Sequence, residues 1–341
     1  MADYFFRAVS TFLLAITLAV AVVAGLYFYQ HNRDELENLP IVVGLTDTYL
    51  QGVNALGGLS NEAIALFYNQ PLVSKAENQK ISGAGPAGDA ELAIRTSWQR
   101  DSILLNLEHK GFSSSKLRQA GRLLDYIDRY KGAALNDMYR SKVPASIKLA
   151  QGILESGAGE SKLARASKNH FGIKARPGRS AQAKIARRQY EAIQDEEFSF
   201  TEPAIGVFNQ YDDNAYDRFE VYRSVADSYA RHSQLLTRPC TKGQTGCYAW
   251  IWQAFPVSRQ EWDISSAADS FYHRSGIAAK DFFGGRTHLP YYAACAAGLK
   301  MAGYATSPRY HQKIAYLIET YELWRFDFDL IRAVEEQNTK H

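Results

Sequence analysis

The sequence predicts a mainly helical α+β protein, and two kinds of pattern support this fold class. Apolar residues recur at helical spacing in three segments, residues 115–137, 145–156 and 310–324. From residue 184 to residue 222 the periodicity is poor and turns are frequent, which indicates a small irregular β region. The chain has 341 residues, enough to bury a full core, so we expect one main domain with appendages.

The helix expected over residues 145–156 has clear start and stop signals. Pro144 suits the first turn of a helix, and Gly157 supplies a left-handed stop. The apolar side chains form one broad stripe, while Gln151 and Glu155 lie together beyond its edge. The helix dipole and the apolar neighbours both disfavour a charged Glu155, so they raise its pKa and suit it to donate a proton near neutral pH. The alternative is an ordinary solvated glutamate at a helix end.

Three other helical segments complete the expected framework. Residues 90–109 have a helical pattern, and residues 115–137 follow with Ser115 as the expected N-cap. Ser307 and Pro308 form a cap and first turn for the last helix. We expect the stripe of that helix to be core: Tyr310, Ile314, Leu317, Ile318, Tyr321 and Trp324.

A long motif surrounds Glu155 and is more specific than a single acid. Between Val143 and Lys174 the chain follows the pattern P-x-S-x-x-L-A-Q-x-x-L-E-S-G-x-G-x-S-x-L-A, and then N-H-F-G-I-K. This stretch resembles the glucosaminidase family of peptidoglycan hydrolases, which includes flagellar muramidase-like enzymes and autolysins. The resemblance implies that Glu155 is the catalytic acid and that Asn169 and Phe171 bind substrate. Many relatives carry an aromatic residue where this chain has Ala158, so a sugar-stacking contact is expected to be missing there.

Two further segments extend the resemblance to about residues 120–328. Residues 211–236 contain an acidic turn, an F-x-x-Y strand and a helix, and residues 298–310 contain G-Y-A-T-S-P. The resemblance implies a lysozyme-like arrangement of helices with a small β lobe. It also implies that Tyr222 binds substrate and that Tyr304 supports the acid within the cleft.

Glycoside hydrolysis normally needs a second carboxylate, which acts as a base or nucleophile roughly 5 to 9 Å from the acid. We rank three candidates in the order Asp213, Asp212 and Glu202, because the first two match the acidic turn of some relatives and the third matches the β-lobe acid of others. The N-acetyl group of the substrate could also assist. The sequence therefore leaves retention or inversion open.

The N-terminal segment is expected to enter a membrane. The stretch from Phe12 to Tyr29 is almost entirely apolar and approaches the ~20 residues that span a bilayer as a helix. We expect residues 1–30 to be a retained anchor, with contact to the membrane through residues 10–30 and the bulk of the chain outside the cytoplasm, on the periplasmic or cell-wall side. A cleaved signal peptide is the alternative.

The remaining domain boundaries follow from composition. Residues 31–114 are expected to be a spacer with short helices, because residues 75–89 are rich in glycine, alanine and polar side chains. Residues 115–330 are expected to form the catalytic domain, followed by a polar tail at residues 331–341. Aromatic residues in the stretch 240–290 could line a glycan groove or simply anchor an insertion: Trp250, Trp252, Phe255 and Trp262.

Cysteine positions and net charge indicate the cellular compartment and the kinds of partner or metal to expect. Cys240 and Cys247 bracket a short glycine-containing loop and could form a disulfide in an oxidising compartment, whereas Cys295 lies in an apolar run and is expected to be a buried thiol. With 39 basic and 36 acidic side chains the net charge is +3, too small to indicate a nucleic-acid partner. No cysteine and histidine cluster has convincing metal-ligand spacing, and no metal or cofactor is expected.

The sequence is therefore interpreted as a membrane-anchored peptidoglycan hydrolase. We expect an endo-β-N-acetylglucosaminidase that cleaves glycan strands with Glu155 as a single general acid. A muramidase or lytic transglycosylase is the alternative within the enzyme class, since either could use the same acid. A non-catalytic wall-binding scaffold that keeps the fold is the alternative from another class.

Overall fold

The computed structural model describes residues 59–69, 94–241 and 246–339. The chain divides into two units, Met1–Ile41 and Val42–His341, and all the described residues belong to the second. The expected membrane anchor at residues 1–30 lies outside the described residues. Among the helices that are described, none has both the length and the apolar character needed to cross a bilayer.

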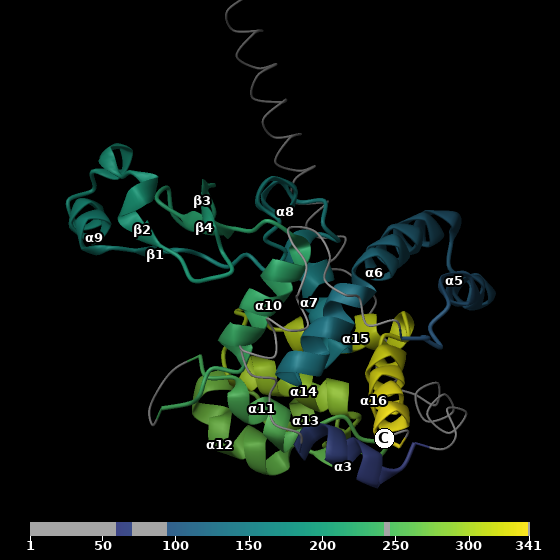
Figure 1. The fold of residues 1–341 in the computed structure, drawn as a ribbon. Helices are drawn as coiled ribbons and strands as arrows, with labels where there is room; N and C mark the ends of the chain where they lie inside the picture. The colour runs from purple at the N-terminus through teal and green to yellow at the C-terminus, as the bar shows by residue number, and fades with distance from the viewer. Residues whose placement is uncertain (1–58, 70–93, 242–245, 340–341) are drawn as a thin grey trace, which may run out of the picture. The chain divides into compact units, whose positions relative to one another are not determined.

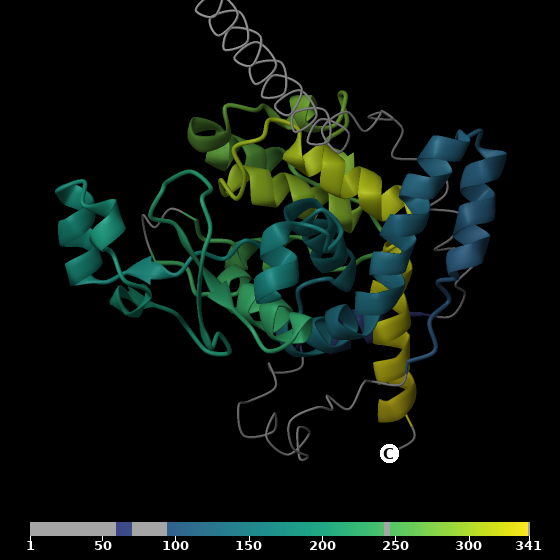
Figure 2. The same cartoon turned by 90° about the horizontal axis from the view of Figure 1, so that it is seen from above.

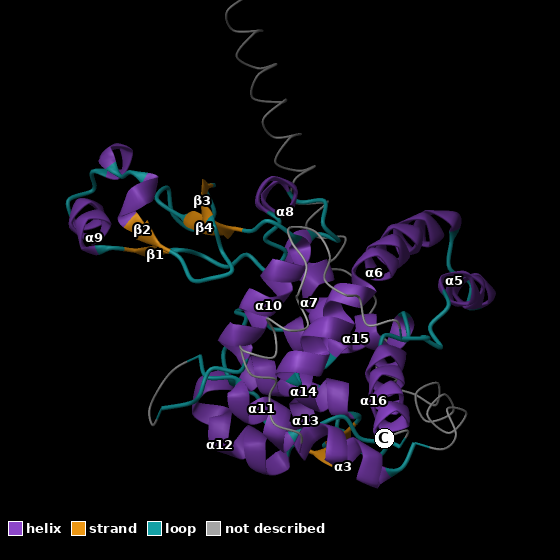
Figure 3. Cartoon of the chain, in the orientation of Figure 1, coloured by secondary structure: helices purple, strands orange, loops and turns teal. Residues whose placement is uncertain are grey.

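Helices make up most of the described chain, and the strands are short and paired two by two (Figures 1 and 3). The three antiparallel pairs in this part of the chain are β1–β2, β3–β4 and β5–β6. The expectation of a mainly helical fold with small sheets is confirmed. The helices are α3 (Asn61–Asn69), α5 (Arg100–His109), α6 (Ser114–Ser141), α7 (Ala145–Ser156), α8 (Lys162–Ser167), α9 (Arg179–Ala186), α10 (Val225–Leu236), α11 (Ala249–Ala254), α12 (Ser265–Ser275), α13 (Ala279–Phe282), α14 (Tyr291–Met301), α15 (Tyr310–Thr320) and α16 (Trp324–Asn338). The strands are β1 (Arg176–Pro177), β2 (Phe198–Ser199), β3 (Gly206–Asn209), β4 (Arg218–Val221), β5 (Trp262–Asp263) and β6 (His288–Leu289).

Helix α7 is the central helix of the bundle and has the bounds that the sequence predicts. Pro144 is its N-cap residue, and Gly157 ends it in the left-handed region with φ of 59°. The helix packs against α6, α14, α15 and α16. Seen from above, the teal helices lie among the blue and yellow ones (Figure 2). Because neighbours cover it on several sides, almost all of its residues are buried, and Leu154 and Glu155 are the two exceptions.

A buried aspartate fixes the start of α7. Asp327 of α16 accepts a hydrogen bond from the Ser146 backbone N–H at 3.0 Å and another from the Ser146 hydroxyl at 2.5 Å. It also accepts one from the Tyr291 hydroxyl of α14 at 2.5 Å. The first N–H groups of a helix have no partner within the helix, so a carboxylate there satisfies one of them. Its negative charge also interacts favourably with the positive end of the helix dipole. Asp327 thereby ties three helices together.

The β region between residues 174 and 222 has a small core of its own. Strands β3 and β4 pair from Gly206–Val221 to Asn209–Arg218, and β1 and β2 pair beside them. Four buried residues form the core of this region: Ala175, Ala181, Ile193 and Phe198. Short strands, the helix α9 and two 3-10 turns account for the poor periodicity of the sequence, and the predicted irregular β region is confirmed.

Three helix boundaries differ from the predictions. Helix α6 begins one residue before Ser115, because the hydroxyl of Ser113 accepts from the Lys116 N–H and caps it instead. Helix α5 begins only at Arg100, ten residues after the predicted start. The predicted last helix is two helices, since α15 ends at Thr320 and Glu322 has φ of 52° before α16 begins.

The expected spacer and the expected tail are partly packed onto the domain. Helix α3 contacts α16 and buries Phe67, and the Trp98 side chain is buried with its indole N–H donating to the Tyr321 carbonyl at 2.8 Å. Helix α16 continues to Asn338 and buries Val334, so residues after 330 are not simply a polar tail. Apolar side chains within these segments explain both differences.

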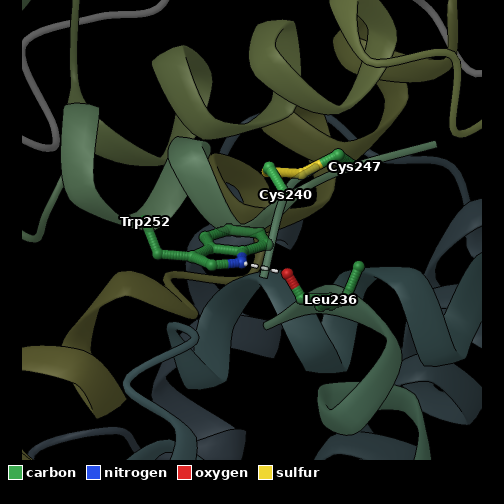
Figure 4. The surroundings of a disulfide bond; sticks show 4 residues. All are labelled: Leu236, Cys240, Cys247 and Trp252. Atoms are coloured by element: carbon green, nitrogen blue, oxygen red, sulfur yellow. Dashed lines mark hydrogen bonds between the residues drawn. A yellow bond between two sulfur atoms is a disulfide. The ribbon is translucent and has the colours of Figure 1, made fainter. Parts of the chain in front are cut away.

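Cys240 and Cys247 form a disulfide with a Cα–Cα distance of 5.4 Å (Figure 4). Beside it the Trp252 indole N–H donates to the Leu236 carbonyl at 2.9 Å, which ties α11 to the end of α10. Cys295 is a buried free thiol, as predicted.

Candidate active site

Glu155 lies at the next-to-last position of α7 and is bound by a tyrosine from another helix. The Tyr310 hydroxyl, at the start of α15, donates to Glu155 Oε1 at 2.9 Å. The Gln151 amide, one turn earlier on α7, donates in turn to the Tyr310 hydroxyl at 3.1 Å. The predicted pair of Gln151 and Glu155 on one face is therefore joined through Tyr310, which the sequence pattern assigned to the core.

Burial raises the pKa of Glu155 to about 7, and the hydrogen bond from Tyr310 opposes part of this rise. The side chain remains exposed to water, while protein atoms crowd the carboxyl group from the other sides. Such a carboxyl is half protonated near neutral pH and can be reached by a solute. Both properties are required of a general acid.

An aromatic row continues from Tyr310. The Tyr304 ring stacks on Tyr310 with centroids 5.5 Å apart, and its hydroxyl lies 2.9 Å from His232 Nε2 of α10. The His232 ring stacks on Phe171 at 4.0 Å. Tyr304 thus lies next to Tyr310, the partner of Glu155.

Behind this row, a buried lysine and aspartate form an ion pair. Lys148 of α7 is fully buried, and its Nζ lies 3.4 Å from Asp137 Oδ2 of α6. The same Nζ donates to the Tyr229 carbonyl at 2.9 Å and to the Ser233 hydroxyl at 3.0 Å, and it lies 3.0 Å from His232 Nδ1. Burial lowers the pKa of Lys148 to about 8, so the amine is still mostly charged at neutral pH.

The E-S-G-A-G segment forms the tight turn that ends α7. The Ser156 hydroxyl donates to the Gly152 carbonyl at 2.5 Å and accepts from the Gly159 N–H at 2.7 Å. Gly157 and Gly159 have φ of 59° and 81°, which glycine adopts without strain. The serine and the glycines of the motif therefore shape the chain directly after Glu155.

Three residues expected to bind substrate are buried instead. Asn169 bonds to the backbone of Ile173 and of Glu220, and so fastens the N-H-F-G turn to β4. Phe171 packs under His232, and the Tyr222 hydroxyl donates to Glu220 at 2.7 Å. Exposed fractions of 1 %, 5 % and 3 % for Asn169, Phe171 and Tyr222 leave almost no surface for a sugar to contact. Their positions indicate structural roles.

The candidates for the second carboxylate lie in the β region. Lys174 Nζ lies 2.9 Å from Asp212, 2.8 Å from Asp213 and 3.0 Å from Asp217. These three carboxylates are close enough together to hold a cation, and the Lys174 ammonium supplies that charge. The hydrogen bond and the charge of Lys174 lower the pKa of Asp213. The remaining candidate, Glu202, is exposed in the loop before β3. The contacts described here join Asp212 and Asp213 to Lys174 and not to the group around Glu155.

The tryptophans of the stretch 240–290 mainly anchor this insertion. Trp252 is buried, Trp250 stacks on Phe271 at 4.7 Å, and the Trp262 indole N–H donates to the Pro256 carbonyl at 2.9 Å. Trp252 and Trp262 also line a cavity of about 700 Å³ with α3, which does not include Glu155.

Comparison with known families decides the class of protein. A family model named glucosaminidase, described as mannosyl-glycoprotein endo-beta-N-acetylglucosaminidase, matches residues 131–323, more than half of the chain. This chain belongs to the glucosaminidase family. It is therefore a glycoside hydrolase, and the resemblance seen in the sequence motifs is confirmed.

Several solved structures are similar to this glucosaminidase-family chain, all at low identity. The catalytic domain of the autolysin Auto from Listeria monocytogenes is 17% identical with a TM-score of 0.35, and the match covers 76% of this chain and 100% of that one. A C-terminally truncated glycoside hydrolase domain of FlgJ from Salmonella typhimurium is 22% identical with a TM-score of 0.32, covering 58% and 96%. An N-acetylmuramoyl-L-alanine amidase from Staphylococcus aureus is 21% identical with a TM-score of 0.34, covering 60% and 43%. A search of curated protein sequences found no significant match.

Sequence reasoning missed three residues of this candidate site. Tyr310 fits a helical core stripe, and nothing local shows that its hydroxyl reaches Glu155. His232 belongs to no cluster with metal-ligand spacing, so no local pattern marks it. Lys148 did carry a signal, because a lysine within an apolar helix between Leu149 and Ile147 is unusual unless it has a buried partner.

Proposed function

We propose that this protein is a peptidoglycan hydrolase that cleaves glycan strands at N-acetylglucosaminyl bonds, with Glu155 as the general acid. The observation that carries the proposal is the Glu155 carboxyl itself. It lies in the E-S-G-x-G motif, it binds Tyr310, and burial raises its pKa to about 7. A carboxyl that is protonated near neutral pH can protonate the leaving oxygen of a glycosidic bond.

For the second group we keep the order Asp213, Asp212 and Glu202. Lys174 lowers the pKa of Asp213, so this carboxylate stays ionised under the conditions in which Glu155 is protonated. Two carboxyl groups whose pKa values are pushed apart suit the roles of acid and of base or nucleophile. The N-acetyl group of the sugar is the alternative nucleophile, and in that mechanism the loss of Asp213 has little effect.

We further propose that the domain is lysozyme-like and acts outside the cytoplasm, held by an N-terminal anchor. The disulfide between Cys240 and Cys247 supports an oxidising compartment. The apolar run from Phe12 to Tyr29 supports the anchor.

The products of digestion test the proposed bond. The purified protein is incubated with purified peptidoglycan, and the released fragments are analysed by mass spectrometry. We expect fragments with N-acetylglucosamine at the reducing end. A reducing N-acetylmuramic acid end would identify a muramidase, and an anhydro end would identify a lytic transglycosylase. Sedimentation with peptidoglycan and no released fragment would identify a binding scaffold and contradict the proposal.

Replacing Tyr310 with phenylalanine is expected to move the alkaline limb of the pH profile upwards. The hydroxyl donates to the carboxylate form of Glu155 and therefore lowers its pKa, so its removal raises the pKa above about 7. The general acid is active when protonated, so kcat/KM falls as pH rises through this pKa. Profiles of wild type and Tyr310→Phe measure the shift, with Tyr272→Phe on an exposed face of α12 as the control. A limb that stays in place or moves downwards would refute this role of Tyr310.

A further inference from the structure

The buried Lys148 has no part in the proposed acid chemistry, yet it lies on the same side of α7 as Glu155. The two residues are seven positions apart, two turns of one helix face. Placing a charged amine in the interior is costly unless its protons are bound. Three acceptors surround this amine: the Tyr229 carbonyl at 2.9 Å, the Ser233 hydroxyl at 3.0 Å and His232 Nδ1 at 3.0 Å. They match its three protons.

The neighbouring hydrogen bonds determine which atom donates and which accepts in each contact with Lys148. The Ser233 hydroxyl donates to Asp137 at 2.5 Å, so towards Lys148 it can only accept. An ammonium group has no acceptor, so His232 Nδ1 must also accept from Lys148. Asp137 lies 3.4 Å from the same Nζ and balances its charge.

This contact decides which nitrogen of His232 carries the proton. Burial and the positive charges of Lys148 and Arg231 lower the pKa of His232 well below its ordinary value, so the ring is neutral. A neutral imidazole whose Nδ1 accepts a hydrogen bond has its proton on Nε2. Nε2 lies 2.9 Å from the Tyr304 hydroxyl and therefore donates to it. The ring is held in place by Phe171, which stacks on it at 4.0 Å.

The same contact decides what the Tyr304 hydroxyl can do. A phenol has one proton, and an oxygen that accepts from His232 keeps that proton for a partner on its other side. On that side lies Tyr310, whose ring stacks on Tyr304 and whose hydroxyl binds Glu155. The Tyr304 side chain is half-buried, so part of its surface is open to a bound molecule.

We propose that Lys148 and His232 are positioning residues that make Tyr304 a hydrogen-bond donor to an acceptor oxygen of the sugar bound beside Glu155. The sugar as ligand rests on the proposed function. Without the lysine, His232 is free to carry its proton on Nδ1, and Tyr304 then donates back to Nε2. The buried ion pair thus sets the direction of the hydrogen bonds at the site while touching neither substrate nor Glu155.

A double-mutant cycle separates this role from a structural one. Removing Lys148 alone would leave Asp137 as an unpaired buried charge, so the variant is Lys148→Met with Asp137→Asn, which removes both charges. We expect Tyr304→Phe to lower kcat/KM of the wild type roughly 3- to 10-fold, as does the Lys148 and Asp137 variant. Adding Tyr304→Phe to that variant should cause little further loss, because the donor is already turned away. Losses that multiply would overturn the proposal.

Substitution of His232 gives a second arm. His232→Gln places an amide N–H near the position of Nε2 and is expected to keep most of the activity, whereas His232→Leu removes the donor to Tyr304 and is expected to lose it. Both remove the stacked imidazole. Equal loss in the two variants would show that only the packing of the ring matters, against the proposal.

The tautomer itself can be measured without any assay of activity. In protein labelled with ¹⁵N-histidine, the signals of His232 are identified by their loss in His232→Gln. We expect an unprotonated Nδ1 and a protonated Nε2 in the wild type. A protonated Nδ1 would overturn the proposal even if the enzyme is active. An inactive wild type with the expected tautomer would instead refute the proposed function and leave the hydrogen-bond arrangement standing.

Discussion

Replacing Glu155 with glutamine is expected to lower kcat on purified peptidoglycan by roughly 10²- to 10⁴-fold, the usual contribution of a general acid. Glutamine has nearly the same shape, and its amide oxygen can still accept the hydrogen bond from Tyr310. It cannot give up a proton to a leaving oxygen. The release of reducing ends from peptidoglycan, measured at pH 6 where Glu155 is mostly protonated, gives the loss directly.

Glu108→Gln is the matched control for this substitution. Glu108 is the next-to-last residue of α5, as Glu155 is of α7, and it is exposed on the surface. We expect Glu108→Gln to keep wild-type activity and both variants to unfold at the wild-type denaturant concentration. Full activity in folded Glu155→Gln would remove Glu155 from the mechanism.

Asp327→Ala is expected to destabilise the protein by about 3 kcal/mol or more. The substitution removes the acceptor of three buried hydrogen bonds, two from Ser146 and one from Tyr291, and each buried donor that loses its acceptor costs about 1 to 3 kcal/mol. It also removes a negative charge from the start of α7, where the helix dipole is positive. Unfolding in urea, followed by circular dichroism at pH 7, measures the free energy.

Asp125→Ala serves as the comparison for Asp327→Ala. Asp125 pairs with Arg100 at 2.7 Å on the surface, where an ion pair contributes at most about 1 kcal/mol. We expect the Asp125 variant to stay within that range. A loss for Asp327→Ala that is no larger than for Asp125→Ala would show that the buried cap does not stabilise α7.

The parts of the fold that could be predicted are those determined by nearby residues. The bounds of α7 follow from Pro144 and Gly157 alone, and both lie within one turn of the helix they limit. The end of α6 also depends on local geometry, with Lys142 in the left-handed region, but no glycine marked it. The break between α15 and α16 had no local signal, because the apolar stripe continues across it from Tyr321 to Trp324.

The candidate site shows the same division. Glu155 could be identified because its motif is continuous in sequence. Its partner Tyr310 lies 155 residues further along the chain. Lys148 and His232, which contact each other, are 84 residues apart in sequence. No rule based on local spacing could reveal either contact. Asn169, Phe171 and Tyr222 were predicted to bind substrate because a motif does not distinguish residues that hold a site together from residues that face it.

The pH dependence of kcat/KM tests most directly the claim that Glu155 acts as a general acid with a raised pKa. This parameter reports the ionisation of the free enzyme. We predict an activity that is retained below neutrality and falls above a pKa of about 7, as Glu155 loses its proton. Activity that already falls above the ordinary pKa of glutamate, about 4.3, would contradict the claim. So would the same fall in activity, at the same pH, in Glu155→Gln.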